Sequence, residues 1–297
     1  MLQSAADQSI RVEYAASVIP GLEDIAAEEI KARWKDDQVI EKRRGWLVFR
    51  HEGDAAELLR LRTTEDVFAI LFRTAALPPY RKGAIPLLAQ MAQRSRYWEQ
   101  AMTTFRQARQ RPVRRVTFRV VAQMTGGHGF RRQEVRDAVL SGVQSRWGGW
   151  KQVSDDAHLE VWVPVVGEWA LIAIRLSTRK MRHRTYKEAH LPASLRPTLA
   201  AAMVMLSRPR PADRFCDPMC GAGTILAERA LAGPCQALLG GDVDPEALQA
   251  AMSNLPDGAG GDRSRSHKRP RAAGSDDPAG AEALLLWDAR ALPLRSG

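Results

Sequence analysis

The most informative segment of the sequence is Arg214-Phe215-Cys216-Asp217-Pro218-Met219-Cys220-Gly221-Ala222-Gly223-Thr224-Ile225-Leu226. It predicts a strand that ends at Asp217, a tight turn around two glycines, and a helix that opens near Thr224. Glycine lets the backbone adopt positive φ and approach a ligand closely. The free N–H groups and the dipole at the start of the helix suit a carboxylate or phosphate. A pair of glycines often makes only a turn. The residues at the ends of the next two predicted strands therefore provide the evidence for or against a ligand site.

The second predicted strand, 236–241, ends at Asp242-Val243-Asp244. Asp242 lies 19 residues after Gly223. An acid about 20 residues past the glycine turn is where doubly wound nucleotide folds hold ribose hydroxyls. We favour Asp242 for the ribose, since Asp244 precedes Pro245 and suits the N-cap of the next helix.

The third predicted strand, 284–287, ends at Asp288-Ala289. Asp288 suits an adenine amine, although it can equally be a solvated acid at a strand end. Acids after three successive strands favour one shared ligand crevice, because doubly wound sheets bind at the carboxyl ends of their strands. The turn lacks the third glycine of a dinucleotide site, and the acid before Pro218 suits the amino group of a methionine.

Composition indicates an ordinary soluble protein with an anionic partner. The 297 residues are 45% hydrophobic and carry a net charge of +10, which favours nucleic acid or an anionic surface. We expect a cytoplasmic location, because the chain shows neither a secretory start nor a long apolar run. Three cysteines argue against a disulfide framework, and Cys216 with Cys220 lacks a second ligand pair, so we expect no metal.

The region before residue 195 shows mixed α/β patterning. We expect strands over 11–18, 45–50, 67–72, 116–122, 158–163 and 168–177. We expect helices over 21–34, 54–62, 85–109, 131–147 and 195–206. Residues 256–280 lack apolar periodicity and are predicted to be a disordered insertion. His128, beside three glycines, is interpreted as a turn residue.

The segment DPMCGAGTILAE at 217–228 closely resembles the DPMCGSGTILIE motif of RNA methylases that carry a THUMP domain. The resemblance extends to PGLEDIAAEEI at 20–30, FRVVAQMTGGHGFRRQEVRDAV at 118–139 and PASLRPTLAAAMVMLS at 192–207. It implies an α/β fold class: an N-terminal ferredoxin-like plus THUMP domain, followed by a partial Rossmann-like class I methyltransferase domain. The implied domains are ferredoxin-like 1–110, THUMP 111–178, a basic linker 179–194, and partial methyltransferase 195–297.

The resemblance implies S-adenosyl-L-methionine (SAM) as cofactor and tRNA guanine-N2 methylation as activity. It places Asp217, Gly221 and Gly223 at the methionine end, Asp242 at the ribose and Asp288 at the adenine. Adjoining residues complete the expected cofactor set: Pro218, Cys220, Thr224, Val243 and Ala289.

The family's catalytic motif, of the Asn/Asp-Pro-Pro-Phe/Tyr or Asn-Leu-Pro-Phe type, would follow the fourth strand. The sequence ends at Gly297 without one, so no catalytic residue is assigned. We expect a truncated gene, a fragmentary record or a split protein.

Basic clusters are the expected RNA contacts, because the guanidinium fork of arginine suits phosphate. The candidate residues are Arg114, Arg115, Arg131, Arg132, Arg179, Lys180, Arg182, Arg184 and Lys187. The alternative interpretation is that these basic residues form a solvated face without a binding role. Two other functions stay open: a catalytically incomplete THUMP RNA-binding fragment and a DNA amine methyltransferase. We assume a monomer that has RNA, tRNA above all, as its partner.

Overall fold

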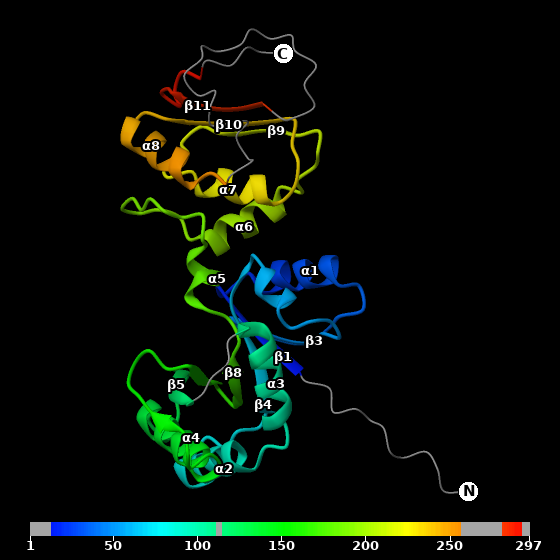
Figure 1. The fold of residues 1–297 in the computed structure, drawn as a ribbon, viewed down its shortest axis with the longest axis vertical. Coiled ribbons are helices and arrows are strands. Elements are labelled where there is room, and N and C mark those ends of the chain that lie inside the picture. The colour runs from blue at the N-terminus through cyan, green and yellow to red at the C-terminus, as the bar shows by residue number, and fades with distance from the viewer. Residues whose placement is uncertain (1–12, 111–114, 257–280, 293–297) are drawn as a thin grey trace, which may run out of the picture. The chain divides into compact units, whose positions relative to one another are not determined.

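The computed structural model describes residues 13–110, 115–256 and 281–292. The chain divides into two compact units, Met1–Thr178 and Arg179–Gly297, which are coloured from blue to green and from green to red in Figure 1. Each unit is described by itself. The insertion expected at 256–280 lies outside the described residues except for Pro256. The finer division of the first unit at residue 110 stays a prediction.

The first unit is built on one eight-stranded sheet with the order β2-β3-β1-β4-β8-β7-β5-β6. Its strands are β1 (Glu13–Val18), β2 (Gln38–Arg43), β3 (Trp46–Arg50), β4 (Thr64–Thr74), β5 (Thr117–Thr125), β6 (Lys151–Gln152), β7 (Leu159–Val166) and β8 (Trp169–Arg175). β4 pairs antiparallel with β1 on one edge and with β8 on the other. Strands from both halves of this unit therefore share a single sheet.

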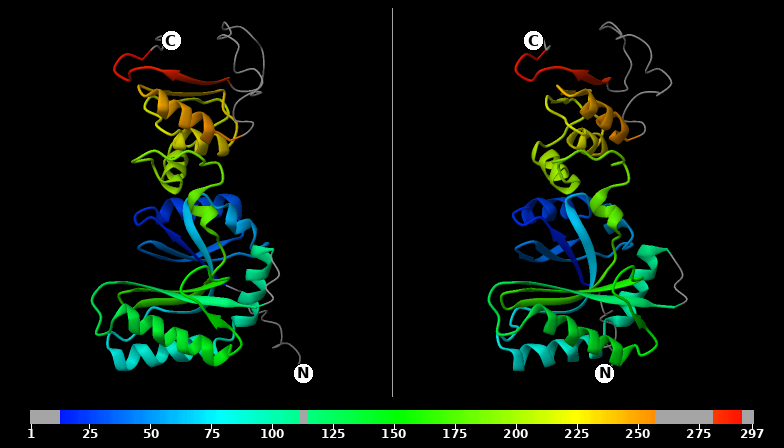
Figure 2. Two further views of the ribbon diagram at one scale, coloured as in Figure 1. Left: turned by 60° about the vertical axis from the view of Figure 1, so that its left-hand side comes forward. Right: turned by 90° about the vertical axis from the view of Figure 1, so that its left-hand side faces the viewer.

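The helices of the first unit are α1 (Glu23–Arg33), α2 (Arg81–Arg94), α3 (Trp98–Arg109) and α4 (Arg132–Arg146). Figure 2 shows α2 and α4 side by side along one face of the sheet. Their approach is close, since a Cβ on Gly142 of α4 would lie 2.3 Å from the carbonyl oxygen of Ala89. Acidic residues in the first turn of α1 and basic residues in its last turn complement its dipole.

Two expectations for this unit were wrong. The single helix expected over 85–109 is two helices, because Ser95 breaks it: its hydroxyl donates to the Leu71 carbonyl at 2.7 Å and accepts from the Tyr97 N–H at 3.2 Å. The helix expected over 54–62 is only a short 3-10 helix, Glu57–Arg60. Strands β2 and β6 were missed because their residues are mostly exposed and lack apolar alternation.

The second unit contains a parallel three-stranded sheet with the order β11-β10-β9. Its strands are β9 (Arg214–Asp217), β10 (Ala237–Asp242) and β11 (Ala281–Leu286), and its helices are α5 (Arg179–His183), α6 (Pro197–Leu206), α7 (Thr224–Leu231) and α8 (Pro245–Asn254). The order three-two-one is that of the first half of a doubly wound fold. Helices α7 and α8 lie on one face of this sheet (Figure 1). No helix in the described ranges is long and apolar enough to cross a membrane.

Candidate functional site

Three acids gather at one edge of the parallel sheet, as the sequence predicts. Asp217 ends β9, Asp242 ends β10, and Asp288 follows β11 by two residues. Asp217 pairs in register with Gly240, so it lies two positions before the level of Asp242. All three residues therefore lie at the carboxyl edge of the parallel sheet, which is the edge where doubly wound folds bind ligands.

The turn between β9 and α7, residues 217–224, is called the cofactor turn here. Gly221 has φ +51°, and a Cβ built on it meets nothing within 4 Å, so the backbone faces open space. Gly223 has φ +70° and precedes the helix, and a Cβ there would lie 2.9 Å from the Cβ of Ala251 in α8. A glycine is therefore required at position 223 for two reasons: the positive φ of the backbone and the close packing against α8.

Hydrogen bonds to the Asp242 carboxylate stabilise the cofactor turn. One carboxylate oxygen accepts a hydrogen bond from the Gly221 N–H at 2.9 Å, and the other accepts from the Asp244 N–H at 3.1 Å. The carboxylate still has lone pairs for the two hydroxyls of a ribose, since each oxygen accepts more than one bond. Asp244 caps α8 by accepting from the Glu246 N–H at 2.9 Å, which confirms the N-cap expected for it.

Asp217 is a half-buried carboxyl in an acidic setting. Burial raises the pKa of Asp217 above its usual value, and the nearby charge of Asp242 raises it further, against a weak hydrogen bond from the Met219 N–H. Such a carboxylate is poorly stabilised by the protein's own groups. A cationic ligand group, such as the ammonium of a methionine, would relieve that cost.

Trp287 is a site residue that the sequence motif did not identify. Its indole Nε1 donates to the carbonyl of Pro218 at 3.0 Å, which ties the end of β11 to the cofactor turn. The ring lies against β10, where a Cβ on Gly241 would be 1.8 Å from it. The paired glycines Gly240 and Gly241 inside a strand were the available signal, because such glycines mark close approach.

The other expected cofactor residues fall into two groups. Cys220 and Thr224 are buried, and Cys220 packs in a core cluster with Leu226 and Ala251. Burial, with the charge of Asp217, raises the pKa of Cys220 to about 12, so this residue is an inert thiol. Pro218 and Val243 lie at the ends of β9 and β10 beside Asp217 and Asp242. Val243 is 72% exposed.

Asp288, with Ala289 after it, is expected to read an adenine. Its carboxylate accepts hydrogen bonds from the Arg290 backbone and guanidinium, and these bonds lower the pKa of Asp288. Arg290 has a side chain that is 90% exposed. An exposed pair of this kind holds its partners weakly, so Asp288 can exchange Arg290 for a ligand amine.

The segment 184–189, expected to be part of a basic linker, is fastened to the cofactor turn. Tyr186 donates to the buried carboxylate of Glu228 at 2.7 Å, and Arg184 pairs with the same carboxylate. The side chain of Asn254 bonds both the N–H and the carbonyl of Ala189, and it also donates to the Ala222 carbonyl at 2.9 Å. Lys187 donates to the Leu195 carbonyl at 3.0 Å and to the Thr224 hydroxyl at 3.3 Å.

These contacts separate the expected RNA residues. Arg115, Arg131, Arg132, Arg179 and Lys180 are exposed, whereas Arg182, Arg184 and Lys187 are half-buried. Arg114 lies outside the described residues. Because the side chain of Arg184 is only 8% exposed and paired with Glu228, its role in this structure is to hold α7. His128 Nε2 donates to the Gly167 carbonyl at 2.9 Å, in keeping with a turn residue.

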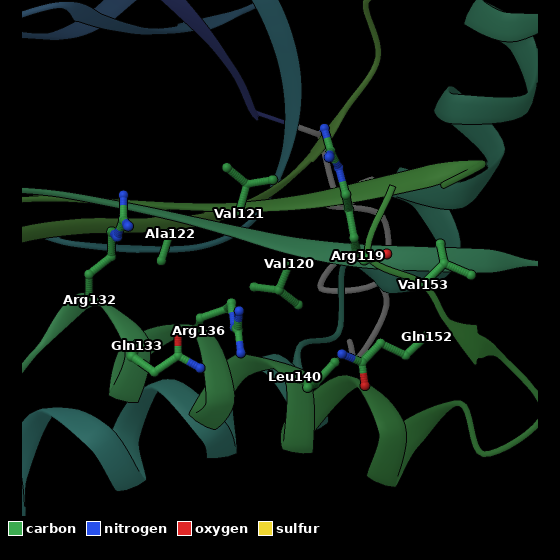
Figure 3. A pocket seen from close by; sticks show the side chains of 11 residues that line it. Arg119, Val120, Val121, Ala122, Arg132, Gln133, Arg136, Leu140, Gln152 and Val153 are labelled. Carbon is green, nitrogen blue, oxygen red and sulfur yellow. The ribbon is translucent and has the colours of Figure 1, made fainter. Parts of the chain in front are cut away.

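A cavity of about 410 Å³ lies between β5 and α4 in the first unit. Figure 3 shows Arg132 and Arg136 rising from α4 toward β5, while Arg119 points to the opposite face of the strand together with Val121. Arg119 forms an ion pair with Glu160, with a distance of 2.6 Å between Nη2 and Oε1. Burial alone would raise the pKa of Glu160, but hydrogen bonds from Trp162, Arg175 and Arg119 hold it below its usual value. The cations on the α4 side of this cavity are therefore Arg132 and Arg136.

The comparisons with known proteins relate this chain to methyltransferases. The RMKL-like methyltransferase domain of UPF0020 matches residues 184–265. A tRNA (guanine(6)-N2)-methyltransferase of Thermus thermophilus is 30% identical over 238 residues, which cover 80% of this chain and 66% of that protein. Residues 184–265 are thus assigned to the RMKL-like methyltransferase domain, and the chain is similar to a guanine-N2 methyltransferase over most of its length. The human U6 snRNA (guanine-N(2))-methyltransferase THUMPD2 is 31% identical over 47% of this chain and 27% of its own length.

A solved structure agrees with this RMKL-like assignment. The crystal structure of TrmN from Thermus thermophilus has a TM-score of 0.66 and 27% identity, and the alignment covers 84% of this chain and 70% of that one. The chain spans less than two thirds of the length of these curated relatives. The family match begins at Arg184, so the segment 184–189 that holds the cofactor turn belongs to the methyltransferase domain.

Proposed function

We propose that this chain carries the RNA-binding and cofactor-binding residues of a SAM-dependent RNA methyltransferase that acts on a guanine N2 of tRNA. The observation that carries the proposal is the placement of three acids beside the cofactor turn: Asp217 and Asp242 end the adjacent parallel strands β9 and β10, and Asp288 follows β11 by two residues. The tRNA substrate is supported by the activity named for the Thermus relative. An enzyme with that substrate would work in the cytoplasm.

The residues at this edge of the sheet fit SAM. Asp217 offers an under-stabilised carboxylate to an ammonium, Asp242 offers acceptors to a diol, and Gly221 leaves open space beside both. SAM supplies the reactive methyl group when bound. The protein's own residues would bind and orient it, and catalysis would come mainly from that positioning.

RNA binding is assigned to the exposed basic residues of both units. Arg132 and Arg136 line the cavity beside β5, and Arg179 and Lys180 begin the second unit. Contacts of this kind read phosphates, so they provide affinity and register with little choice of sequence. The target nucleotide would then be selected by RNA shape.

The test is a pair of calorimetric titrations into the 297-residue chain, one with S-adenosylhomocysteine (SAH) and one with tRNA. Binding of both supports the proposal. Binding of tRNA without SAH would instead support the second candidate, an RNA-binding protein without a working cofactor site, which the Arg132 and Arg136 cavity favours. Stronger binding of duplex DNA than of tRNA would overturn the substrate class.

A further inference from the structure

Lys187 lies beside the N-terminus of α7, and the free N–H groups at a helix N-terminus suit an anion. It comes from the segment 184–189 and reaches the Thr224 hydroxyl, at the first residue of α7, with an Nζ to Oγ1 distance of 3.3 Å. Thr224 directly follows Gly223, so the ammonium lies at the far end of the cofactor turn from Asp217. The two charges of opposite sign thus bracket the turn.

Hydrogen bonds and an ion pair on both sides of Lys187 fix its position. Tyr186 donates a hydrogen bond to Glu228, and Arg184 forms an ion pair with it. Glu228 lies one helical turn after Thr224 on α7. Asn254 fixes Ala189 to the carbonyl of Ala222 within the turn. The chain on both sides of Lys187 is therefore anchored to the cofactor turn and to the helix that it opens.

The ammonium of Lys187 has bonding capacity to spare. It carries three donors, and the described residues give it two acceptors, the Leu195 carbonyl and the Thr224 hydroxyl. Within the described residues no carboxylate lies within ion-pair distance of it. Burial lowers the pKa of Lys187, and no nearby negative charge offsets this effect. A half-buried cation without a counter-ion is costly, and an anionic ligand would stabilise it.

We propose that Lys187 binds the methionine carboxylate of SAM, together with the N–H groups at the start of α7. This inference rests on the proposed function. It assigns opposite ends of the cofactor's amino acid to opposite sides of the turn, the ammonium to Asp217 and the carboxylate to Lys187. Lys187, which the sequence analysis assigned to RNA contact, is thereby assigned to the cofactor site.

The experiment compares two ligands by calorimetry on the full 297-residue chain. SAH carries the amino-acid carboxylate, whereas 5′-methylthioadenosine keeps the adenine, ribose and sulfur but lacks it. Lys187→Met keeps the apolar stem of the side chain and removes the charge. We expect it to weaken SAH binding about 10-fold to 100-fold, the range for a hydrogen bond to a charged group, and to leave methylthioadenosine binding unchanged. Lys82→Met, at an exposed position of α2, is the control and should change neither.

Three outcomes would overturn the proposal. Equal loss of both ligands would show that Lys187 only holds the segment in place. Unchanged SAH binding with weakened tRNA binding would assign Lys187 to an RNA phosphate. Failure of the unmodified chain to bind either ligand would remove the cofactor site itself, and with it the proposed function, which separates that failure from the first two.

Discussion

The Trp287 ring occupies the space that any side chain at Gly241 would need. A Cβ on Gly241 would lie 1.8 Å from the indole, while the indole N–H holds the Pro218 carbonyl at 3.0 Å. The end of β11 therefore presses on β10 and fixes the cofactor turn at the same time. The geometry of the cofactor turn depends on this packing as well as on its own glycines.

Gly241→Ala should force Trp287 away from β10 and release Pro218. We expect a loss of about 1–3 kcal/mol in the free energy of unfolding, as for overpacked sites, and a lower affinity for SAH. Chemical denaturation and calorimetry measure the two effects. Gly149→Ala is the matched control, because a Cβ there meets nothing within 4 Å. Equal stability of the two variants would mean that Trp287 does not lie where the structure places it.

Asp242→Ala should weaken the binding of SAH and of methylthioadenosine alike, since both ligands carry the ribose. The expected cost is about 1–3 kcal/mol, the scale of lost buried hydrogen bonds. Asp242→Asn keeps an acceptor for the Gly221 N–H and serves as the milder comparison. If calorimetry shows unchanged affinity for both ligands in the alanine variant, Asp242 is not the ribose acid.

Asp217→Asn should stabilise the ligand-free protein near neutral pH. The folded pKa of Asp217 is raised, so the folded state binds more protons than the unfolded state between the two pKa values. Stability from this group is present below the unfolded pKa and is lost as pH rises through the folded pKa. Removing the charge should therefore add about 0.5–2 kcal/mol at pH 7, and less as the pH falls.

Thermal unfolding of the Asp217→Asn variant and the parent chain across pH measures this difference. SAH binding in the same variant should weaken, because the ammonium loses its carboxylate partner. A variant that is less stable than the parent at pH 7 would contradict the unfavourable burial of Asp217.

Arg132→Gln combined with Arg136→Gln should weaken tRNA binding and reduce its salt dependence. For each phosphate that the protein no longer neutralises, the slope of log K against log salt should fall by about 0.7–0.9. Arg44→Gln, an exposed arginine at the β2–β3 turn, is the control for charge alone. An unchanged slope in the double variant, measured by fluorescence anisotropy, would move the RNA interface away from the cavity between β5 and α4.

The parallel sheet could be predicted from sequence because each of its strands ends in a readable signal. Asp217 and Asp242 end β9 and β10, Asp288 follows β11 by two residues, and the spacing from Gly223 to Asp242 indicates the order of the elements. The cap at Asp244 followed from its place before Pro245. These signals are local, so the sequence carries them directly.

Long-range contacts were beyond the sequence pattern. The clamp from Asn254 to Ala189 joins residues 65 positions apart, and nothing near either residue announces it. The role of Lys187 was hidden in a run of basic residues that is typical of a solvated face. The break at Ser95 depends on a hydroxyl bond to Leu71 in another element, which helical periodicity does not register.

The binding of SAM beside Asp217 and Asp242, at the carboxyl edge of the parallel sheet, is tested most directly by calorimetry. SAH would be titrated into the 297-residue chain and into its Asp242→Ala variant. We expect one binding site in the parent chain and a clear loss of affinity in the variant. Absence of binding in a folded parent chain, or equal binding in both proteins, would contradict a cofactor site at this edge of the sheet.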